Sequence, residues 1–348
     1  MTRILGVGFL GAGPATQAIH LPTLARLQNQ FRIANVMDPV GATAEAVAAR
    51  VGAAWTTDAA ALLADPAVDV VAISSPSQFH AEQALAAIAA GKRGILIEKP
   101  LAVTREEADA IADAAREAGT AIIVGAMHVF DPGWRAALEH HAEKMRGASF
   151  IRQTVALPPN PVFEDRATEI ASRGGPPPPR DYSQPEVRAA AIRGGILGLA
   201  IHDLPLVRQL VADWAEIEVL SARALAPFGY VLNMRAGSQL IQMVASFHRH
   251  CAVAWSLECH GQDGVTTVNF TPSYVHAGSA DVAWAGPDGS TTIRSRRSNG
   301  YEAEWEHIYA MLVNNAVPIQ SIDDALDDFS FAMQVADGAA REAAKDWF

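Results

Sequence analysis

The sequence predicts an α/β fold, a doubly wound parallel sheet, followed by an α+β domain built on an open-faced, mostly antiparallel sheet. Short apolar segments alternate with helical segments up to about residue 125, which is typical of parallel sheets. After His128 this alternation stops, and strand patterns separated by turns follow. The chain has 348 residues, more than one hydrophobic core usually supports. We therefore predict two domains, residues 1–125 and 126–348.

The first strand pattern leads into a glycine turn. An apolar segment over Ile4–Leu10 is followed by Gly-Ala-Gly-Pro-Ala-Thr and then by an apolar helical segment through Leu27. Glycines at the first and third places of such a turn let the backbone approach a pyrophosphate, which lies at the positive end of the helix. The sixth place, usually Gly or Ala, is Thr16 here. We predict cofactor contacts at Gly11, Gly13, Ala15 and Thr16.

The second strand pattern ends in an acid that supports the same interpretation. The apolar segment Phe31–Met37 ends at Asp38, about 22 residues beyond Thr16, and an acid about 20 residues beyond such a turn binds a ribose hydroxyl in dinucleotide sites. Pro39 and Val40 follow, so no arginine adjacent to Asp38 could bind the 2′-phosphate of NADP. The predicted cofactor is NAD, with NADP less favoured.

Two further strands complete the predicted cofactor edge. Val68–Ile73 is a buried-strand pattern that ends in Ser74-Ser75-Pro76, and a helix over Phe79–Ala90 follows with His80 at its start. Gly94–Ile97 is the next strand and ends in Glu98-Lys99-Pro100. Because ligands of doubly wound sheets bind beyond the carboxyl ends of the strands, we predict cofactor contacts from Ser75, Pro76, His80, Glu98 and Lys99.

Lys99 is the strongest catalytic candidate from the residues alone. A rigid strand end would hold its amine at the cleft, and partial burial lowers the pKa of an ammonium toward the range useful for proton transfer. The alternative is a surface lysine that caps the strand. Glu98 has two interpretations as well, a contact with the nicotinamide ribose or a salt bridge at the strand end.

The second half reads mainly as antiparallel sheet. A helix over Pro132–Lys144 and a strand over Ala148–Leu157 lead into a segment rich in Pro and Gly, Pro158–Arg193, which we predict as a long loop. Further strand patterns follow up to Trp284. A capped helix begins near Ser321, and one interpretation is that it packs against the first domain. The exposed face of such a sheet needs a cover, which favours a homodimer or homotetramer.

Composition excludes several classes of function. The formal net charge is −11 with no basic cluster, which argues against nucleic acid as a partner. No uncharged apolar stretch reaches the roughly 18 residues of a membrane span. Two cysteines in 348 residues indicate a reducing compartment, so we expect a cytoplasmic protein. His250-Cys251 and Cys259-His260 would hold their cysteines about 26 Å apart on one strand, and no metal site is predicted.

The chain resembles the Gfo/Idh/MocA oxidoreductase family. The resemblance rests on motifs in the family's order along the whole chain: the Gly-x-Gly turn running into Ala18-Ile-His-Leu-Pro22, Ser75-Pro76 followed by His80-Ala-Glu82, Glu98-Lys-Pro100, the segment from Gly195 through His202-Asp203-Leu204, and Ser321-Ile-Asp-Asp-Ala325. It implies a Rossmann domain that holds NAD(P), an open-sheet domain for substrate contacts and oligomerisation, and hydride transfer at a secondary alcohol or ketone, commonly of a sugar or cyclitol.

The resemblance also implies site residues in the second domain, with two departures. The family pattern has an aspartate and, four residues later, a histidine on one helix face; the histidine is His202, but Gly198 occupies the aspartate's position. Asp203 would point about 100° away on such a helix and is a poor substitute. Where the family often has arginine or tyrosine facing substrate, this chain has His128. Lys99 and His202 are thus the catalytic candidates, and Lys99, His128 and His202 the substrate-binding ones.

Three functions stay open at this stage. The first is an NAD-dependent dehydrogenase or reductase acting on a polyhydroxylated ring. The second is a redox-cycling enzyme that retains NAD and carries out epimerisation, elimination or glycoside cleavage through a transient ketone. The third is a non-catalytic NAD-binding sensor or scaffold, because Gly198 replaces the expected carboxylate. The substrate and the direction of the net reaction are not encoded in these motifs.

Overall fold

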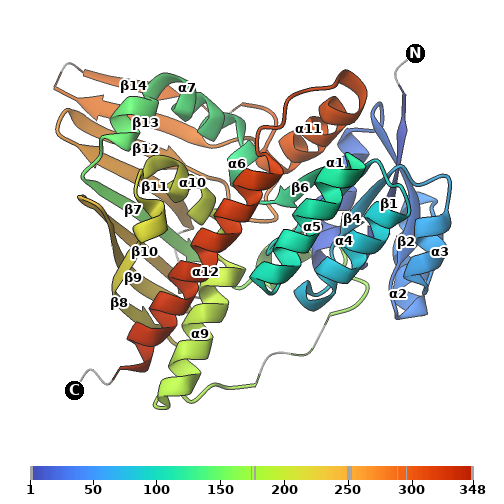
Figure 1. Ribbon diagram of the computed structural model, residues 1–348, viewed down its shortest axis with the longest axis horizontal. Coiled ribbons are helices and arrows are strands. Elements are labelled where there is room, and N and C mark those ends of the chain that lie inside the picture. The colour runs from blue at the N-terminus through green and yellow to red at the C-terminus, as the bar shows by residue number, and fades with distance from the viewer. Residues whose placement is uncertain are drawn as a thin grey trace. The chain divides into compact units, whose positions relative to one another are not determined.

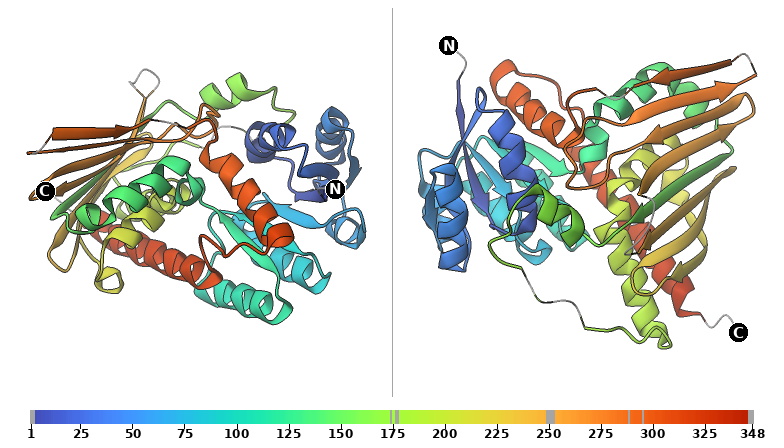
Figure 2. Two further views of the ribbon diagram at one scale, coloured as in Figure 1. Left: turned by 90° about the horizontal axis from the view of Figure 1, so that it is seen from above. Right: turned by 180° about the vertical axis from the view of Figure 1, so that it is seen from behind.

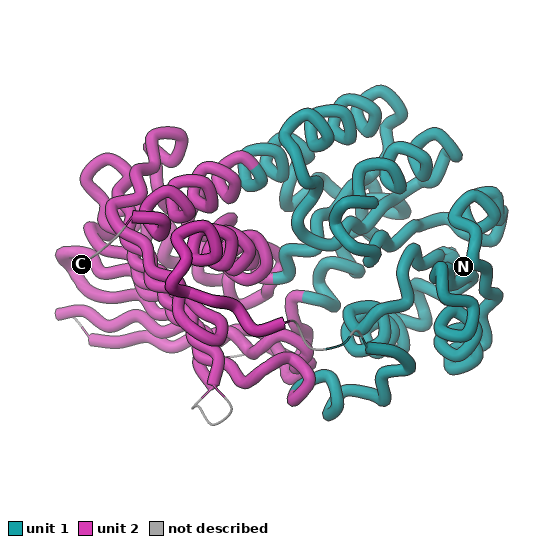
Figure 3. The backbone as a smooth tube through the Cα atoms, turned by 90° about the horizontal axis from the view of Figure 1, so that it is seen from below, with its two compact units in different colours: residues 1–127, 163–175, 301–329 teal, residues 128–162, 176–300, 330–348 magenta. Residues whose placement is uncertain are grey.

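A computed structural model describes residues 3–173, 175, 178–248, 253–287, 289–294 and 296–345. These residues form two compact units (Figure 3). Unit 1 comprises residues 1–127, 163–175 and 301–329, and unit 2 comprises residues 128–162, 176–300 and 330–348. The chain therefore passes between the units several times, whereas the predicted domain limits at residues 125 and 126 describe a single passage.

Unit 1 is built on a six-stranded sheet with the strand order β3-β2-β1-β4-β5-β6 (Figure 1). Every neighbouring pair is parallel. The strands are β1 Leu5–Leu10, β2 Phe31–Met37, β3 Ala54–Thr56, β4 Val70–Ile73, β5 Gly94–Glu98 and β6 Ala121–Gly125. The direction in which successive strands are added to the sheet reverses between β1 and β4, and in doubly wound folds the cofactor binds at such a point. The predicted Rossmann sheet is confirmed.

Helices connect these strands. The chain is helical from Pro14 through a π-helical stretch, Thr16–His20, into α1 Leu21–Arg26. The others in this part are α2 Gly41–Val51, α3 Ala59–Ala64, α4 His80–Ala89 and α5 Arg105–Ala118. Local sequence sets the limits of α5, because Thr104 and Glu107 form a reciprocal capping box and Gly119 ends the helix at φ 66°.

Unit 2 is built on an eight-stranded sheet with the order β14-β13-β12-β11-β7-β10-β9-β8. All neighbouring pairs are antiparallel except β7 and β10, which confirms a mostly antiparallel sheet. The strands are β7 Phe150–Leu157, β8 Glu218–Ala224, β9 Gly229–Ala236, β10 Gln239–Phe247, β11 Ala254–Gly261, β12 Gly264–Asn269, β13 Asp281–Gly286 and β14 Gly289–Ile293.

The helices of unit 2 lie on one face of this sheet (Figures 1 and 2). They are α7 Pro132–Arg146, α9 Pro185–Gly198, α10 Leu204–Leu210 and the later turns of α12 Ile322–Ala344. The short α6, Met127–Phe130, precedes α7. Arg193 of α9 pairs with Asp337 of α12 at 2.9 Å, which joins two of these helices. The predicted open-faced sheet is therefore the architecture of this unit.

The predicted loop over Pro158–Arg193 is wrong in two places. It contains α8, Pro161–Ala167, and the first turns of α9; residues 174, 176 and 177 lie outside the described part. Both helices begin at a proline, Pro161 and Pro185. Proline suits the first turn of a helix, where its missing N–H would have no partner, so residues taken as breakers start helices here.

The last helices divide between the units. Most of α11, Gly300–Asn314, and the first turns of α12 belong to unit 1. Asp323 at the start of α12 pairs with Arg116 of α5, so the first turns of this helix pack within unit 1. Among the described residues no single helix is long and apolar enough to cross a membrane; the segments Pro185–His202 and Leu204–Leu210, bent by 67°, pass that test only as a pair.

Candidate functional site

The predicted cofactor residues of unit 1 lie at one edge of its sheet. The register aligns Leu10 with Met37 and with Ile73, and Ile73 with Ile97, so the four strands end together. One or two residues beyond these ends stand Gly11, Asp38, Ser75 and Lys99. The structure therefore brings these residues together where a doubly wound sheet binds its ligand.

The glycine turn is shaped by two different requirements. Gly11 has φ +103°, and a Cβ there would lie 2.8 Å from the carbonyl atoms of Ser74. A Cβ on Gly13 would meet nothing within 4 Å in the described part of the chain. Thr16, in the sixth place, donates from Oγ1 to the Gly11 carbonyl at 2.7 Å and holds the turn. The backbone at Gly13 is thus open to a close-packed ligand such as a pyrophosphate.

Asp38 is fixed against this turn. Its Oδ2 accepts from the Ala12 N–H at 3.0 Å and its Oδ1 accepts from the Val40 N–H at 2.9 Å. Each carboxylate oxygen keeps acceptor capacity for a further donor. The open backbone at Gly13 and the oriented carboxylate of Asp38 both fit a dinucleotide, whose ribose hydroxyls are donors and whose pyrophosphate needs backbone space.

Ser75 and His80 order the adjoining strand-end loops. The Ser75 hydroxyl donates to Gln83 Oε1 at 2.7 Å. His80 is buried, with Nδ1 at 2.8 Å from the Pro100 carbonyl and Nε2 at 2.9 Å from the Ser75 carbonyl. Both ring nitrogens therefore face backbone of this chain, and His80 holds the loops after β4 and β5 together. Its contact with a cofactor stays a prediction, as does that of Pro76.

Glu98 belongs to a buried chain of hydrogen bonds that the sequence did not reveal. Its Oε1 contacts His20 Nε2 at 3.0 Å, and His20 Nδ1 lies 3.2 Å from Nε1 of Trp305. Because indole N–H only donates, Nδ1 is the acceptor and Nε2 carries the proton given to Glu98. Burial alone would raise the pKa of Glu98, but the hydrogen bond from His20 and the positive charge of Lys99 lower it overall.

Lys99 stands beside this carboxylate, partly buried at the end of β5. Burial lowers the pKa of its ammonium, and the negative charge of Glu98 opposes that shift only in part. A lysine amine with a lowered pKa gives up its proton more readily and so becomes a better partner for proton exchange with a substrate oxygen. Lys99 is thus partly buried at a strand end with a lowered pKa, and its catalytic role stays a prediction.

A second buried carboxyl, Glu304 of α11, lies in the same unit and was not predicted. It is 1% exposed, and its Oε1 has no hydrogen-bond partner among the described residues. Burial and then the charge of Glu98 raise its pKa well above the usual value. The pKa values of the two carboxyls are thus shifted in opposite directions, upward for Glu304 and downward for Glu98.

We expect Glu304→Gln to stabilise the protein at alkaline pH. With its pKa raised on folding, native Glu304 keeps a proton that the unfolded chain releases above about pH 4.5, so wild-type stability falls by about 1.4 kcal/mol per pH unit between the two pKa values. Thermal unfolding from pH 4 to pH 9 should show equal midpoints at the acid end and a growing advantage for the variant above it. Exposed Glu117 of α5 provides the control Glu117→Gln. Parallel curves for wild type and Glu304→Gln would contradict the assignment.

In unit 2, His202 does not lie on the helix that was predicted. The helix α9 ends at Gly198, Leu199 has φ −122° and ψ −55°, and His202 closes a 3₁₀ turn over Ala200–His202. Gly198 and His202 are therefore not neighbours on one helix face, and the expected side-by-side relation between those two positions is wrong. The helix ends between these two positions, because Leu199, directly after Gly198, departs from helical backbone angles. A Cβ on Gly198 would meet nothing within 4 Å among the described residues.

A carboxylate is nevertheless present near His202, supplied by the next residue. Asp203 is fully buried and accepts from Gln153 Nε2 at 2.7 Å, from Trp255 Nε1 at 2.9 and 3.0 Å, and from His128 Nδ1 at 2.9 Å. The rings of His128 and His202 are 6.2 Å apart. Asp203 was set aside as a substitute because a regular helix would turn it away from His202; in the structure its carboxylate lies against His128.

One signal in the sequence could have revealed part of this cluster. In β7 the side chains of Ile151, Gln153, Val155 and Leu157 are buried in alternation. Gln153 is the polar member of an otherwise apolar face, and a buried amide needs partners. Trp255, by contrast, looks like an ordinary core residue in its strand.

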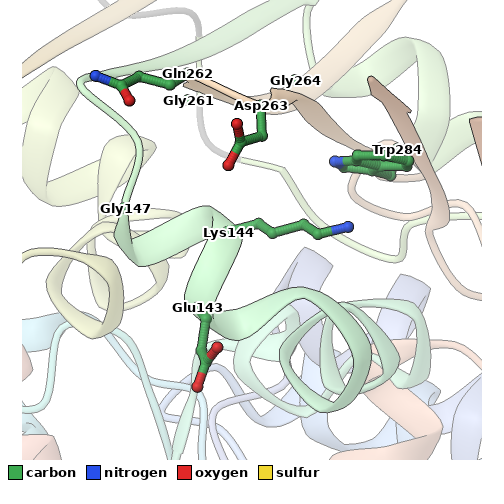
Figure 4. A pocket seen from close by; sticks show the side chains of 8 residues that line it. All are labelled: Glu143, Lys144, Gly147, Gly261, Gln262, Asp263, Gly264 and Trp284. Atoms are coloured by element: carbon green, nitrogen blue, oxygen red, sulfur yellow. The ribbon is translucent and has the colours of Figure 1, made fainter. Parts of the chain in front are cut away.

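One cavity of unit 2, of about 320 Å³, contains none of the predicted site residues (Figure 4). It lies between the end of α7 and the turn joining β11 to β12, and Lys144 and Trp284 face each other across it. The Lys144 ammonium stands 3.6 Å from the Trp284 ring centroid, so the aromatic face is already occupied. No group of three or more His, Cys, Asp or Glu in the described part could hold a metal ion; His250 and Cys251 lie outside that part.

Comparison with known proteins agrees with this geometry. A family model described as an oxidoreductase family with an NAD-binding Rossmann fold matches residues 5–126. An inositol 2-dehydrogenase of Rhizobium meliloti is 27% identical, over 97% of this chain and 96% of that protein. Residues 5–126 therefore match the NAD-binding Rossmann domain of the Gfo/Idh/MocA family. The predictions of an oxidoreductase and of NAD as the cofactor are confirmed at the level of this family.

One relative and one solved structure show how far the likeness extends. A scyllo-inositol 2-dehydrogenase (NAD(+)) of Bacillus subtilis is 33% identical over 66% of this chain, and the alignment spans 57% of that enzyme's length. The solved structure of UDP-N-acetylglucosamine 3-dehydrogenase from Acidithiobacillus ferrooxidans superposes with a TM-score of 0.73, at 19% identity, over 98% of this chain and 100% of that one. The structural likeness shows the fold alone.

Proposed function

We propose that this protein is an NAD-dependent oxidoreductase that transfers a hydride between nicotinamide and a secondary alcohol or ketone of a cyclitol, sugar or related polyol. The observation that carries the proposal is the setting of Lys99, which stands with a lowered pKa at the same sheet edge as the Gly11–Gly13 turn and Asp38. The relatives named as inositol dehydrogenases support a cyclitol as the substrate class.

In unit 1, some residues would bind the cofactor and Lys99 would transfer the proton. Gly13 and Asp38 would hold the pyrophosphate and ribose of NAD, which supplies the hydride acceptor when bound. Glu98 is kept ionised by His20, and we assign it a nicotinamide ribose hydroxyl. Lys99 takes the proton of the reacting hydroxyl, and its ammonium then stabilises negative charge on the substrate oxygen.

Unit 2 supplies the remaining candidates for substrate contact. His202 is 8% exposed and His128 3% exposed, so both rings are largely withdrawn from solvent and held by neighbouring side chains. We assign both to hydroxyl groups of the substrate and keep His202 as the second candidate for proton transfer. Neither assignment needs a carboxylate at Gly198.

Turnover assays test the proposal directly. Protein, NAD and a panel including scyllo-inositol, myo-inositol and common aldoses should give reduced nicotinamide, detected by its absorbance, with at least one cyclitol. Failure of every compound in both directions, with NAD against polyols and NADH against the corresponding ketones, would overturn it. Binding of NAD measured by calorimetry on the same sample separates a missing substrate from a missing cofactor site.

Cofactor choice provides a sharper prediction. We expect Asp38→Ala to raise the KM for NAD at least about tenfold, since a ribose hydroxyl loses an ionised acceptor, and to reduce the preference for NAD over NADP, because repulsion of the 2′-phosphate is gone. Steady-state kinetics with both cofactors measure this. The control is Asp58→Ala, which removes the cap of α3 and should change neither KM. An unchanged preference in Asp38→Ala would contradict the role.

The redox-cycling alternative is favoured by one observation in unit 1. Residues 168–171, here called the strap, are tied to the glycine turn: the Ala171 N–H donates to Gln17 Oε1 at 2.8 Å, and Arg50 donates to Gln17 Oε1 at 3.1 Å and to the Glu169 carbonyl at 2.6 Å. Gln17 in turn donates to the Ala12 carbonyl at 2.7 Å. A strap fixed to the turn would slow cofactor exchange. NAD that survives purification, with turnover but no net reduction, would select this alternative.

Assembly and compartment complete the proposal. The helices of unit 2 lie on one face of its sheet (Figure 2), and the other face supports a homodimer or homotetramer. The presence of only two cysteines supports the reducing cytoplasm. Light scattering coupled to size-exclusion chromatography measures the mass of the assembly.

A further inference from the structure

The buried Asp203 carboxylate has an unusual set of partners for a structural aspartate. Two of its donors, the Gln153 amide and the Trp255 indole N–H, are neutral side chains at 2.7 Å and at 2.9 and 3.0 Å. The third is Nδ1 of His128 at 2.9 Å. Asp131, the other strongly buried aspartate near His128, accepts within the described part of the chain from the backbone N–H groups of Gly133, Trp134 and Ala280. Asp203 alone of the two reaches an imidazole.

These contacts select one tautomer of His128. Amide and indole N–H groups donate and do not accept, so they require lone pairs from both carboxylate oxygens. The remaining hydrogen bond is then satisfied when His128 Nδ1 carries a proton and donates it to Oδ1. In the neutral ring, Nε2 is left with a lone pair and acts as an acceptor.

Packing fixes the plane of the same ring. Phe270 stacks on His128 with centroids 4.0 Å apart and planes 23° apart, and Trp255 meets it edge-on at 4.8 Å and 84°. A ring flip would have to break the Asp203 hydrogen bond between these two aromatic neighbours. The direction of Nε2 is therefore set together with its hydrogen-bonding character.

We propose that Asp203 is a positioning residue that holds His128 as a hydrogen-bond acceptor, so that unit 2 selects a ligand presenting a hydroxyl O–H at Nε2. The inference rests on the proposed function for the identity of that ligand, a hydroxyl group of the polyol. Specificity then depends on the pair Asp203 and His128. Because Nε2 of His128 needs a donor, it discriminates against a substrate analogue that lacks the hydroxyl.

The tautomer can be measured without any substrate. Two-dimensional ¹⁵N NMR of protein labelled at histidine, above neutral pH, distinguishes Nδ1–H from Nε2–H, and the spectrum of His128→Phe identifies the signals by their absence. We expect Nδ1–H in the wild type and a shift toward Nε2–H in Asp203→Asn, because the carboxylate acceptor is lost. Nε2–H in the wild type would overturn the proposal, and this outcome is independent of whether the protein turns over a cyclitol.

Discrimination among substrates tests the consequence. With NAD, myo-inositol and its monodeoxy analogues as probes, the wild type should prefer myo-inositol over at least one analogue by about tenfold to 100-fold in kcat/KM. Asp203→Asn should lose most of that preference, and adding it to His128→Phe should cause no further loss. Asp131→Asn controls for a buried aspartate substitution and should keep the preference. Full discrimination in a folded Asp203→Asn would overturn the inference.

Discussion

Replacement of Lys99 by methionine is expected to lower kcat by about 1,000-fold or more while leaving NAD bound. Methionine keeps much of the buried stem but removes the group that exchanges the substrate proton and stabilises the developing alkoxide, effects worth about 10²–10⁴ and 10²–10³ respectively. Rates come from nicotinamide absorbance and the Kd of NAD from calorimetry. A variant with more than a tenth of wild-type kcat would refute the assignment.

The pH profile and a second variant separate the two roles of Lys99. Burial lowers the pKa of its ammonium, and alcohol oxidation needs the neutral amine, so the wild-type rate should rise with pH and level off below the usual lysine value of 10.5. Lys99→Arg keeps the charge but cannot give up a proton at these pH values. Loss of activity in both variants identifies a proton acceptor; substantial activity in Lys99→Arg would reduce the role to electrostatic stabilisation.

The same strand supplies a matched control. Lys92 precedes β5, is buried, and donates to the carbonyls of Asp65 and Val68, both at 2.9 Å. Its pKa is also lowered by burial. Lys92→Met should therefore reduce stability but not kcat in the folded fraction. The comparison isolates position along the strand, because the two lysines flank opposite ends of β5.

The parts of the fold predictable from sequence are those set by local pattern. Apolar strands followed by Gly11, Asp38, Ser75 and Lys99 fix the parallel sheet and its cofactor edge, because strand ends in a doubly wound sheet coincide. The helix starting at Pro185 was missed because proline both ends and starts helices. Its end at Gly198 could not be predicted either, since glycine is tolerated within a helix and also ends one.

Long-range contacts account for what the sequence did not reveal of the site. His20, Glu98 and Trp305 come from segments up to 285 residues apart, and only folding shows that they form one chain of hydrogen bonds. The partners of Asp203 could not be predicted for a related reason: His128, Gln153 and Trp255 come from segments 75, 50 and 52 residues away. The family resemblance indicated His202, but its surroundings include Trp255 of β11, whose ring centroid lies 5.8 Å from that of His202.

A series of glycine substitutions should divide the turn into a part needed for folding and a part needed for NAD. Gly11→Ala combines a strained φ of +103° with a Cβ 2.8 Å from the Ser74 backbone, and we expect a loss of about 3 kcal/mol or more in stability. Gly13→Ala meets nothing within 4 Å among the described residues, so its stability should stay within about 0.5 kcal/mol of wild type.

For NAD affinity, we expect the substitution at Gly13 to have a large effect, although it barely changes stability. The methyl group of Gly13→Ala would occupy the space that a pyrophosphate needs, so we expect at least a tenfold weaker Kd for NAD in a fully folded protein, because a lost close contact of about 1.4 kcal/mol corresponds to that factor. Gly52→Ala, at φ +67° with nothing near its Cβ, measures the cost of backbone strain alone and should bind NAD normally. Denaturant unfolding and calorimetry on the three variants supply both numbers. Wild-type NAD affinity in Gly13→Ala would place the pyrophosphate away from this turn, and with it the reacting end of the cofactor away from Lys99.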